Sequence, residues 1–231
     1  MDSHKFTDRP MDLPVELLMM LHQKHRIFQQ LTSEFLISQA KEASKKERSQ
    51  TYANKSAFTY GEVEFISLGE TIEIIKAMHG EIKPGGKFYD LGSGTGKAVI
   101  SAALLHNFDK CIGIELLTSL FDISQQAKIN YDLLRINILQ ENSTVWNTLP
   151  DVEFLCGNMF EVSWSDADFI FVNSTCFDEK MMDRIALSEV KPGTWAVTLT
   201  KSIASNSWKV LQSFRKSMSW GAATVYIHIR I

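Results

Sequence analysis

Cysteine is scarce in this sequence. The three cysteines, Cys111, Cys156 and Cys176, are far apart, and each lies in or beside an apolar run. There is no CxxC pair and no Cys/His cluster with the spacing of a zinc site. We therefore expect no bound metal, and we expect the cysteines to be buried structural thiols of a protein from a reducing compartment.

Long apolar runs and a strong excess of one charge are also lacking. No apolar run approaches the roughly 20 residues that a membrane-spanning helix needs, and the N-terminus MDSHKFTDRP does not have the basic-then-apolar pattern of a signal peptide. Lys and Arg number 24 against 27 Asp and Glu, and the net charge of −3 favours neither nucleic acid nor an anionic membrane. The sequence predicts a soluble intracellular protein, of nucleus or cytoplasm, with no membrane partner.

What is present is the composition of an ordinary globular protein, 45% hydrophobic and 22% charged. Apolar residues recur at helical spacing from Val15 to Leu36, ahead of the charged, turn-friendly stretch KEASKKERSQ at 41–50. A loop is predicted over TYANKSAFTYGE at 51–62, and a further helix over Val63–His79. Residues 1–58 are thus expected to form a mostly helical N-terminal segment ahead of a larger domain at 59–231.

From Pro84 onward, short apolar strands alternate with helical patterns. Such alternation is typical of a parallel sheet with helices on both faces, so we predict an α/β domain. The predicted strands are Phe88–Leu91, Cys111–Glu115, Val152–Cys156, Asp168–Asn173 and Thr194–Thr200. The predicted helices are Ala98–His106, Leu117–Leu139 and Lys180–Glu189, and a C-terminal β-hairpin is predicted from Ser217–Trp220 and TVYIHIRI at 224–231.

Three glycines, Gly92, Gly94 and Gly96, follow the first predicted strand in FYDLGSGTGKAVI (88–100) and open a helix. Glycine there lets the backbone turn tightly and approach a ligand at the carboxyl end of a strand. A Walker loop needs a glycine at position 91 and Ser or Thr at position 98, where this chain has leucine and alanine. The dinucleotide fingerprint needs a glycine at position 97, which is a lysine, so both phosphate-binding patterns are disfavoured.

An acidic residue, Asp90, stands just before this loop, which includes Ser93. A carboxylate there repels a pyrophosphate but favours a cation, and S-adenosylmethionine carries both an ammonium and a sulfonium. Glu115 ends the second predicted strand, where a carboxylate can accept hydrogen bonds from ribose hydroxyls. The combination predicts S-adenosylmethionine as cofactor and methyl transfer as the reaction; for Glu115 alone, an ordinary strand-end acid is the alternative.

The methyl acceptor is expected beside the cofactor, where the fourth predicted strand ends in FIFVNSTCF (169–177). Asn173 interrupts this apolar strand, and its amide oxygen is a candidate for orienting an acceptor amine; a turn-forming asparagine is the alternative. In TVYIHIRI, Tyr226 lies on the polar face of the last strand, which indicates either a face toward a cleft or a solvent-exposed edge. His228 shares that face and is expected to be structural.

Five segments in this order and spacing resemble the catalytic domain of the disruptor-of-telomeric-silencing family of histone lysine methyltransferases. They are YGEVEF (60–65), FYDLGSGTGK (88–97), GIELL (113–117), DFIFVNSTCF (168–177) and SMSWGAATVYIH (217–228). The resemblance implies a Rossmann-like, seven-stranded class I methyltransferase fold at 59–231. Residues 1–58, which the resemblance does not cover, are expected to cap the cofactor cleft and to shape substrate access. It also implies a chromatin enzyme that transfers a methyl group from S-adenosylmethionine to a lysine of a protein.

The resemblance assigns a role to each matching position. Tyr60 and Glu62 match a loop over the methionine end of the cofactor, while Asn173 and Tyr226 match residues that line a narrow lysine channel. An aromatic-lined channel would lower the pKa of the lysine by penalising its charged form. Its candidate walls are Phe177, Tyr226, Tyr60 and Trp220. The predicted catalytic residues are Asn173, Tyr226 and Phe177, and the predicted cofactor-binding residues are Tyr60, Glu62, Asp90, Gly92, Ser93, Gly94, Gly96, Lys97, Glu115, Asn158 and Met159.

The chain departs from the family pattern at three of these positions. Asn158 and Met159 stand where the family has an acidic residue and a phenylalanine for the adenine. An asparagine can still donate and accept, and a methionine can lie on a ring face. Lys97 replaces a common glutamine, and it either neutralises the carboxylate of the cofactor or points into water.

The substrate is less well defined than the reaction. The one basic cluster, KEASKKER at 41–48, is interrupted by Glu42 and Glu47, so a solvated helix end and a contact with nucleic acid or an acidic partner are both open. Without a large basic patch, a non-histone protein is as credible a substrate as a histone. Two further alternatives are a methyltransferase acting on RNA or a small molecule, and a catalytically inactive cofactor-like binding module.

Overall fold

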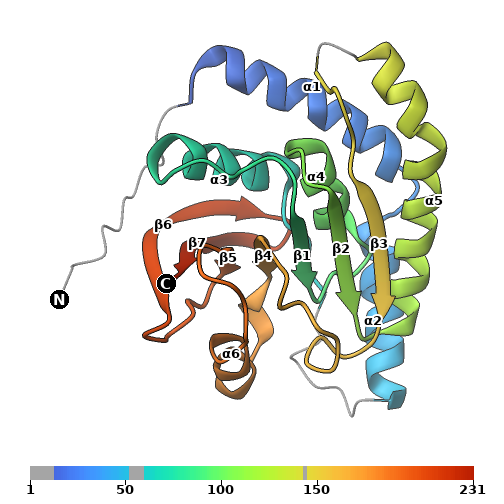
Figure 1. Ribbon diagram of the computed structural model, residues 1–231. Coiled ribbons are helices and arrows are strands. Elements are labelled where there is room, and N and C mark those ends of the chain that lie inside the picture. Colours follow the sequence, from blue (N-terminus) through green and yellow to red (C-terminus); the bar gives the residue numbers. More distant parts are fainter. Residues whose placement is uncertain (1–12, 52–59, 143–144) are drawn as a thin grey trace.

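Seven strands form one mixed sheet in the computed structural model, which describes residues 13–51, 60–142 and 145–231 (Figure 1). The strand order is β3-β2-β1-β4-β5-β7-β6. The first five strands are parallel, and β7 runs antiparallel to both β5 and β6. The strands are β1 (Lys87–Leu91), β2 (Lys110–Glu115), β3 (Asp151–Cys156), β4 (Phe169–Val172), β5 (Trp195–Leu199), β6 (Trp208–Met218) and β7 (Gly221–Arg230). The predicted Rossmann-like α/β class is confirmed.

Helices cover both faces of the sheet. Successive side chains of a strand point to opposite faces, so Phe88 of β1 joins one apolar cluster and Tyr89 joins the other. The first cluster contains residues of α1 (Val15–Thr32), α3 (Phe65–Met78), α4 (Lys97–Leu105) and α5 (Thr118–Glu141), and the second contains residues of α6 (Glu179–Ala186). The predicted strands and helices of this α/β unit begin and end within a few residues of the observed ones.

The charged stretch at 41–50, which was expected to be turn-friendly, is instead part of a second N-terminal helix, α2 (Ile37–Thr51). Lys, Glu, Ala and Arg are good helix formers, so composition favours a helix here once one face finds a partner. That partner is α5: both carboxylate oxygens of Glu47 accept backbone hydrogen bonds at its first turn, from Thr118 N at 2.9 Å and Ser119 N at 2.8 Å. The helix is therefore docked onto the α/β unit by a side chain that caps α5.

Glu47→Ala is expected to lower the free energy of unfolding by about 1 kcal/mol, the usual cost of losing a helix cap. Burial raises the pKa of the Glu47 carboxyl, but hydrogen bonds from Ser119 and Thr118 outweigh it and leave that pKa below its ordinary value. The contribution is therefore present above the unfolded-state pKa and is lost as the pH falls through the folded-state pKa. Urea unfolding at neutral and acidic pH measures it, with Glu42→Ala on the exposed side of the same helix as control; equal losses in the two variants would contradict the capping role.

The C-terminal hairpin is longer than predicted. Its first strand, β6, covers Trp208–Met218, and Ser219 and Trp220 form the turn into β7. A register shift between Val210 and Gln212 interrupts the alternation of buried and exposed residues, which is the pattern from which a strand is predicted. Of the predicted loop at 51–62, residues 52–59 lie outside the described residues, and Tyr60 to Glu64 are neither helix nor strand.

The prediction of three buried cysteines is correct only for Cys111, in the middle of β2. Cys156 is exposed because it ends β3, which is an edge strand of the sheet. Cys176 is half-buried in the short 3₁₀ turn Ser174–Cys176 that follows β4. An apolar neighbourhood in sequence thus does not ensure burial where a strand ends.

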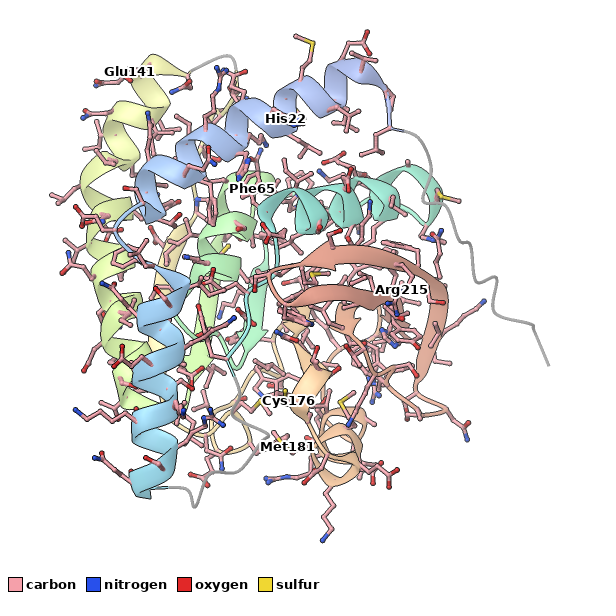
Figure 2. The ribbon with its side chains drawn as sticks, turned by 180° about the vertical axis from the view of Figure 1, so that it is seen from behind. His22, Phe65, Glu141, Cys176, Met181 and Arg215 are labelled. Atoms are coloured by element: carbon pink, nitrogen blue, oxygen red, sulfur yellow. The ribbon has the colours of Figure 1, made fainter. Side chains whose placement is uncertain are left out.

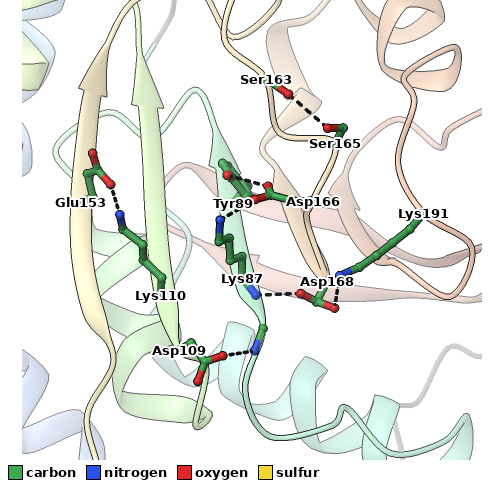
Figure 3. A network of polar contacts seen from close by, with 11 residues as sticks. Lys87, Tyr89, Asp109, Lys110, Glu153, Ser163, Ser165, Asp166, Asp168 and Lys191 are labelled. Atoms are coloured by element: carbon green, nitrogen blue, oxygen red, sulfur yellow. Dashed lines mark hydrogen bonds and ion pairs between the residues drawn. The ribbon is translucent and has the colours of Figure 1, made fainter.

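A polar network closes the amino end of the sheet (Figure 3). Asp168 accepts a hydrogen bond from Lys87 N at 2.9 Å and pairs with Lys191 at 2.6 Å, while Asp166 accepts from the Tyr89 hydroxyl at 2.9 Å. The charged side chains of this network thus have partners within the protein. Among the described residues, none of the helices is both long enough and apolar enough to cross a membrane.

Candidate functional site

A cavity of about 280 Å³ lies at the carboxyl ends of β1, β2 and β4. The loops after these strands and after β3 line it, together with the Tyr60–Val63 segment and Trp220. Twelve of the predicted site residues are brought together there: Tyr60, Glu62, Asp90, Gly92, Ser93, Gly94, Lys97, Glu115, Asn158, Met159, Asn173 and Phe177. Gly96 and Tyr226 do not line it.

The glycine loop connects β1 to α4. At Gly94, whose φ is +55°, a Cβ atom would overlap the ring of Tyr60, so glycine allows this loop and the Tyr60 segment to meet over the cavity. Gly96 caps α4 with a φ of +82°, and a Cβ atom there would overlap the ring of Phe154 on β3. Gly96 therefore packs the helix against the sheet and does not contact the cavity, which differs from its predicted cofactor-binding role.

Gly96→Ala is expected to destabilise the fold by more than conformational strain alone. A left-handed φ costs an alanine about 1–2 kcal/mol, and overpacking against Phe154 adds about 1–3 kcal/mol. Gly193 is the matched control because its φ is +86° and an added Cβ would meet nothing within 4 Å. Denaturant unfolding of Gly96→Ala and Gly193→Ala separates the two contributions, and equal losses would show that the contact with Phe154 is unimportant.

Asp90 is the most unusual charged residue of the cavity. The Asp90 residue is 2% exposed, and its Oδ1 has no hydrogen-bond partner among the described residues. The hydroxyl of Ser93, which is also buried, has no partner among them either. Burial, with the nearby carboxylate of Glu115, raises the pKa of Asp90 well above its ordinary value. An unpaired buried carboxyl group that faces a cavity is suited to a ligand with a cationic or hydrogen-donating group.

Glu115 lies at the end of β2 and is 7% exposed. Its Oε2 accepts from Gly94 N at 2.7 Å and its Oε1 accepts from Leu117 N at 2.8 Å, so it joins the glycine loop to the start of α5. Burial raises the pKa of Glu115, although these backbone hydrogen bonds act in the opposite direction. Each oxygen keeps a further lone pair with which to accept a ligand hydroxyl.

A connected set of side chains holds the Tyr60–Glu62 segment onto the glycine loop. The hydroxyl of Tyr60 donates to Glu62 Oε1 at 2.5 Å, and the Thr95 hydroxyl lies 2.7 Å from the same phenol oxygen. Burial, together with the charge of Glu62, raises the pKa of Tyr60, so the phenol remains a donor. Lys97 Nζ pairs with Glu62 Oε2 at 2.9 Å and donates to Phe35 O at 2.8 Å, so Lys97 does not point into water. Its predicted contact with the carboxylate of the cofactor stays a prediction.

The N-terminal helices contribute to this edge of the cavity. Ala40 of α2 packs with Leu117 and Leu120 of α5, and Tyr60 packs against the same group. Leu117, Leu120 and Tyr60 also line the cavity. The wall beside Glu115 therefore rests on α2.

The other end of the cavity is formed by the segment after β4. The Nδ2 of Asn173 donates to Gly61 O at 3.1 Å, and its Oδ1 accepts from the Thr175 hydroxyl at 2.9 Å. The amide of Asn173 thus links the end of β4 to the Tyr60–Glu62 segment. Its predicted role in orienting an acceptor amine stays a prediction.

Apolar and sulfur-containing side chains line the cavity together with Asn173. Figure 2 labels two of them, Cys176 in the 3₁₀ turn after β4 and Met181 in α6. Trp220 covers Gly61 so closely that a Cβ on that glycine would be 2.6 Å from the indole ring. Phe171, Phe177, Val63, Cys176, Met181 and Trp220 all line the cavity.

At the opposite wall, Asn158 is turned toward its own loop. Its Oδ1 accepts from Phe160 N at 3.1 Å, and its Nδ2 donates to Glu161 at 3.0 Å. Met159 and Phe160 line the cavity beside it. Sequence reasoning missed several lining residues, although Leu116 and Leu117 directly follow Glu115 and Phe160 directly follows Met159. Among the missed residues are Leu116, Leu117, Leu120, Phe160, Thr175, Cys176 and Met181.

Tyr226 does not line the cavity, and its strand, β7, is internal to the sheet and not a solvent-exposed edge. It pairs with Thr198 of β5 and Ser213 of β6, and its ring lies 6.2 Å from that of His228. His228 is fully buried and its Nε2 accepts from Ile203 N at 3.0 Å, which agrees with the predicted structural role. On this face, the polar side chain of His228 is thus occupied by hydrogen bonds with Ile203 N and Ala196 O.

The part of the chain that is described contains no group of three or more His, Cys, Asp or Glu residues arranged to hold a metal ion. The cavity offers two buried carboxyl groups, a glycine loop, and an apolar pocket with sulfur and aromatic side chains. The carboxyl groups and the glycine loop can bind a ligand that has cationic and hydroxyl groups, and the apolar pocket can bind an uncharged ligand next to it.

Comparison with known proteins places these features in a family context. The family model described as "Histone methylation protein DOT1" matches residues 40–225. The chain is 29% identical over 164 residues to a Caenorhabditis elegans protein named "Histone-lysine N-methyltransferase, H3 lysine-79 specific", covering 70% of this chain and 16% of that protein. It is also 29% identical over 157 residues to a Candida albicans protein of the same name, covering 67% and 11%. The chain thus spans only a small part of these relatives.

Among solved structures, "Crystal Structure of E81Q mutant of MtNAS" matches with a TM-score of 0.51 and 11% identity, over 94% of this chain and 78% of that one. At this identity the match concerns the fold alone.

Proposed function

Because the chain belongs to the DOT1 family of histone methylation proteins, we propose that it is an S-adenosylmethionine-dependent protein-lysine N-methyltransferase. One observation carries the proposal: the buried Asp90 carboxyl, whose Oδ1 has no partner among the described residues, shares a cavity with Glu115, the glycine loop and the apolar pocket around Asn173. Asp90, Glu115 and the glycine loop suit the amino acid and ribose parts of the cofactor. The apolar pocket suits an uncharged amine.

The residues that would hold the cofactor can be named from their chemistry. Asp90 would accept from its ammonium group, and the remaining lone pairs of Glu115 would accept from its ribose hydroxyls. Met159, Phe160 and the leucines after Glu115 would contact its adenine. When bound, the cofactor supplies a methyl group on a positively charged sulfur.

The acceptor end acts on the protonation state of the lysine. An unperturbed lysine has a pKa of about 10.4, and a wall of Phe177, Met181 and Trp220 penalises its charged form and lowers that pKa. The amine then reaches the cofactor with its lone pair free, having released its proton to water. Holding the amine in line supplies most of the remaining acceleration, so no dedicated base is required.

The substrate proposed is a protein lysine, with histone H3 as the first candidate because the curated relatives carry that specificity in their names. Chromatin, and hence the nucleus, is the corresponding proposed location. Lys41, Lys45 and Lys46 are exposed on α2 but are interspersed with Glu42, so a nucleic acid partner is not part of the proposal.

Calorimetric titration with S-adenosylmethionine and its demethylated product tests the cofactor, and transfer of a labelled methyl group tests the substrate. Core histones, reconstituted nucleosomes, free histone H3 and total RNA are offered in parallel. Binding in the micromolar range with label on a histone lysine is expected. Label on RNA would favour the nucleic acid alternative, and binding without transfer to any of the four would favour an inactive module.

A further inference from the structure

Thr200 has an unusual backbone conformation. Its φ is +72°, and it is the only non-glycine residue in the described ranges with a positive φ. A β-branched side chain is rare in this region, because the conformation is strained and persists only where the surroundings impose it. Thr200 directly follows β5, at the carboxyl end of the sheet where the acceptor end of the cavity lies.

The turn Leu199–Lys201 holds the segment Ser174–Phe177 at three successive points. The Ser174 hydroxyl donates to Leu199 O at 2.6 Å. The hydroxyls of Thr175 and Thr200 are 2.9 Å apart, and Lys201 Nζ donates to Phe177 O. Thr200 itself is fixed from the other side, because its N–H donates to Thr224 O on β7 at 2.7 Å.

The hydrogen bonds from Thr200 run in one direction. The Thr175 hydroxyl donates its only proton to Asn173 Oδ1, which is 2.9 Å away and is a pure acceptor. In the contact between the two threonines, the donor must therefore be Thr200. Because Asn173 Nδ2 donates to Gly61 O at 3.1 Å, the relay passes from Thr200 through Thr175 and Asn173 to the segment over the cavity.

We propose that Thr200 is a positioning residue for methyl transfer: its strained backbone directs its hydroxyl at Thr175, which fixes the amide of Asn173 and, through it, Gly61 at the acceptor end. This inference rests on the proposed function. The strained φ of Thr200 directs its hydroxyl at Thr175, whereas a residue with an ordinary φ in this turn would direct its side chain elsewhere. Loss of the hydroxyl leaves the Thr175 hydroxyl without its donor and the Asn173 amide less firmly oriented.

Three substitutions at position 200 separate the hydroxyl from the strain. Thr200→Gly removes both, Thr200→Val keeps the shape and strain but removes the hydroxyl, and Thr200→Ser keeps the hydroxyl. We expect Thr200→Gly to have an equal or higher melting temperature than the wild type, because glycine adopts a positive φ freely. Its kcat for lysine methylation should nevertheless fall about fivefold to tenfold, the factor that corresponds to one ordinary hydrogen bond.

In the same series, Thr200→Val should lose a similar factor in kcat, whereas the kcat of Thr200→Ser should stay within about twofold of the wild-type value. The KM for the cofactor should change little in any of the three variants. The side-chain amide signals of Asn173 in the NMR spectrum of the unliganded protein give a readout without activity. They should shift in the glycine and valine variants and not in the serine variant.

Wild-type kcat in Thr200→Gly, or equal losses in Thr200→Ser and Thr200→Gly, would overturn the positioning role. Unchanged Asn173 amide signals in all three variants would overturn the relay itself. If the wild type methylates no lysine, the proposed function fails and the role in methyl transfer fails with it. In that case the NMR comparison still decides whether the relay exists.

Discussion

Asp90→Asn is expected to lower the affinity for S-adenosylmethionine about a hundredfold, which is within the range for loss of a buried charged partner. Asp90 is 2% exposed and its Oδ1 lacks a partner among the described residues, so water does not readily replace a cationic group of the ligand there. Asparagine keeps the shape and removes the charge. Calorimetric titration measures the change, and Asp122→Asn on the exposed side of α5 is the control. Wild-type affinity in Asp90→Asn would remove this carboxylate from the cofactor site.

The same substitution should have the opposite effect on the stability of the unliganded protein. Burial, then the charge of Glu115, raises the pKa of Asp90 well above its ordinary value. An acid with a raised folded-state pKa contributes stability below its unfolded-state pKa, and that contribution is lost as the pH rises through the folded-state pKa. Asp90→Asn cannot ionise, so its melting temperature should exceed that of the wild type at neutral and alkaline pH. The gain should shrink in acid.

Cofactor affinity should therefore rise with pH in the wild type, because the charged form of Asp90 is the one that pairs with a cation. Titrations in two buffers of different ionisation enthalpy should detect proton release on binding. The other charged residues that line the cavity are Glu115 on β2, and Glu62 and Lys97, which pair with each other at 2.9 Å. Glu115→Gln should reduce the pH dependence, since it removes the repulsion that helps to raise the pKa of Asp90. A pH-independent affinity in the wild type would contradict this account.

The sequence predicts the central part of the site because that part depends on residues close together in the chain. Asp90 and the glycines lie within one strand–loop–helix unit, and Glu115 ends the neighbouring strand, so parallel pairing of β1 with β2 brings them to the same edge. The motifs at 60–65 and 168–177 lie in the part of the chain matched by the family model, which confirms the predicted family.

The supporting contacts could not be predicted in this way, because each joins segments far apart in sequence. Glu47 caps α5 across the gap between α2 and Thr118, and Lys97 contacts Phe35 O. Neither contact produces a periodic pattern or a motif. Tyr226 shows the converse problem: alternation places it on the polar face of β7, but only the strand order shows that β7 is internal between β5 and β6. The cofactor and acceptor roles of the individual residues stay predictions.

Asn173→Ala is expected to lower kcat about a hundredfold. A reaction that depends on the orientation of its reactants can lose about this factor in rate when a reactant is misplaced by about 1 Å. Its amide is the only side-chain link in the described residues from the segment after β4 to Gly61 O, and its loss also leaves the Thr175 hydroxyl without its acceptor. The cofactor end should remain intact. Asp90 and Glu115 are untouched, and the Tyr60–Glu62 segment is still held by Lys97 and by Ser219, whose hydroxyl accepts from Glu62 N at 3.0 Å.

Single-turnover kinetics with a methylated lysine product as readout, alongside calorimetric titration of the cofactor product, measure the two effects separately. The dissociation constant should change less than about fivefold, because only the acceptor side is disturbed. Asn173→Asp is the informative companion: it keeps the acceptor for Thr175 but places a carboxylate against the Gly61 carbonyl oxygen, so it should lose at least as much kcat. If Asn173→Ala weakened cofactor binding as much as turnover, Asn173 would be a residue of the cofactor site. Combined with Thr200→Gly, the loss should be smaller than the product of the two separate losses, because both substitutions break the same hydrogen-bonded relay.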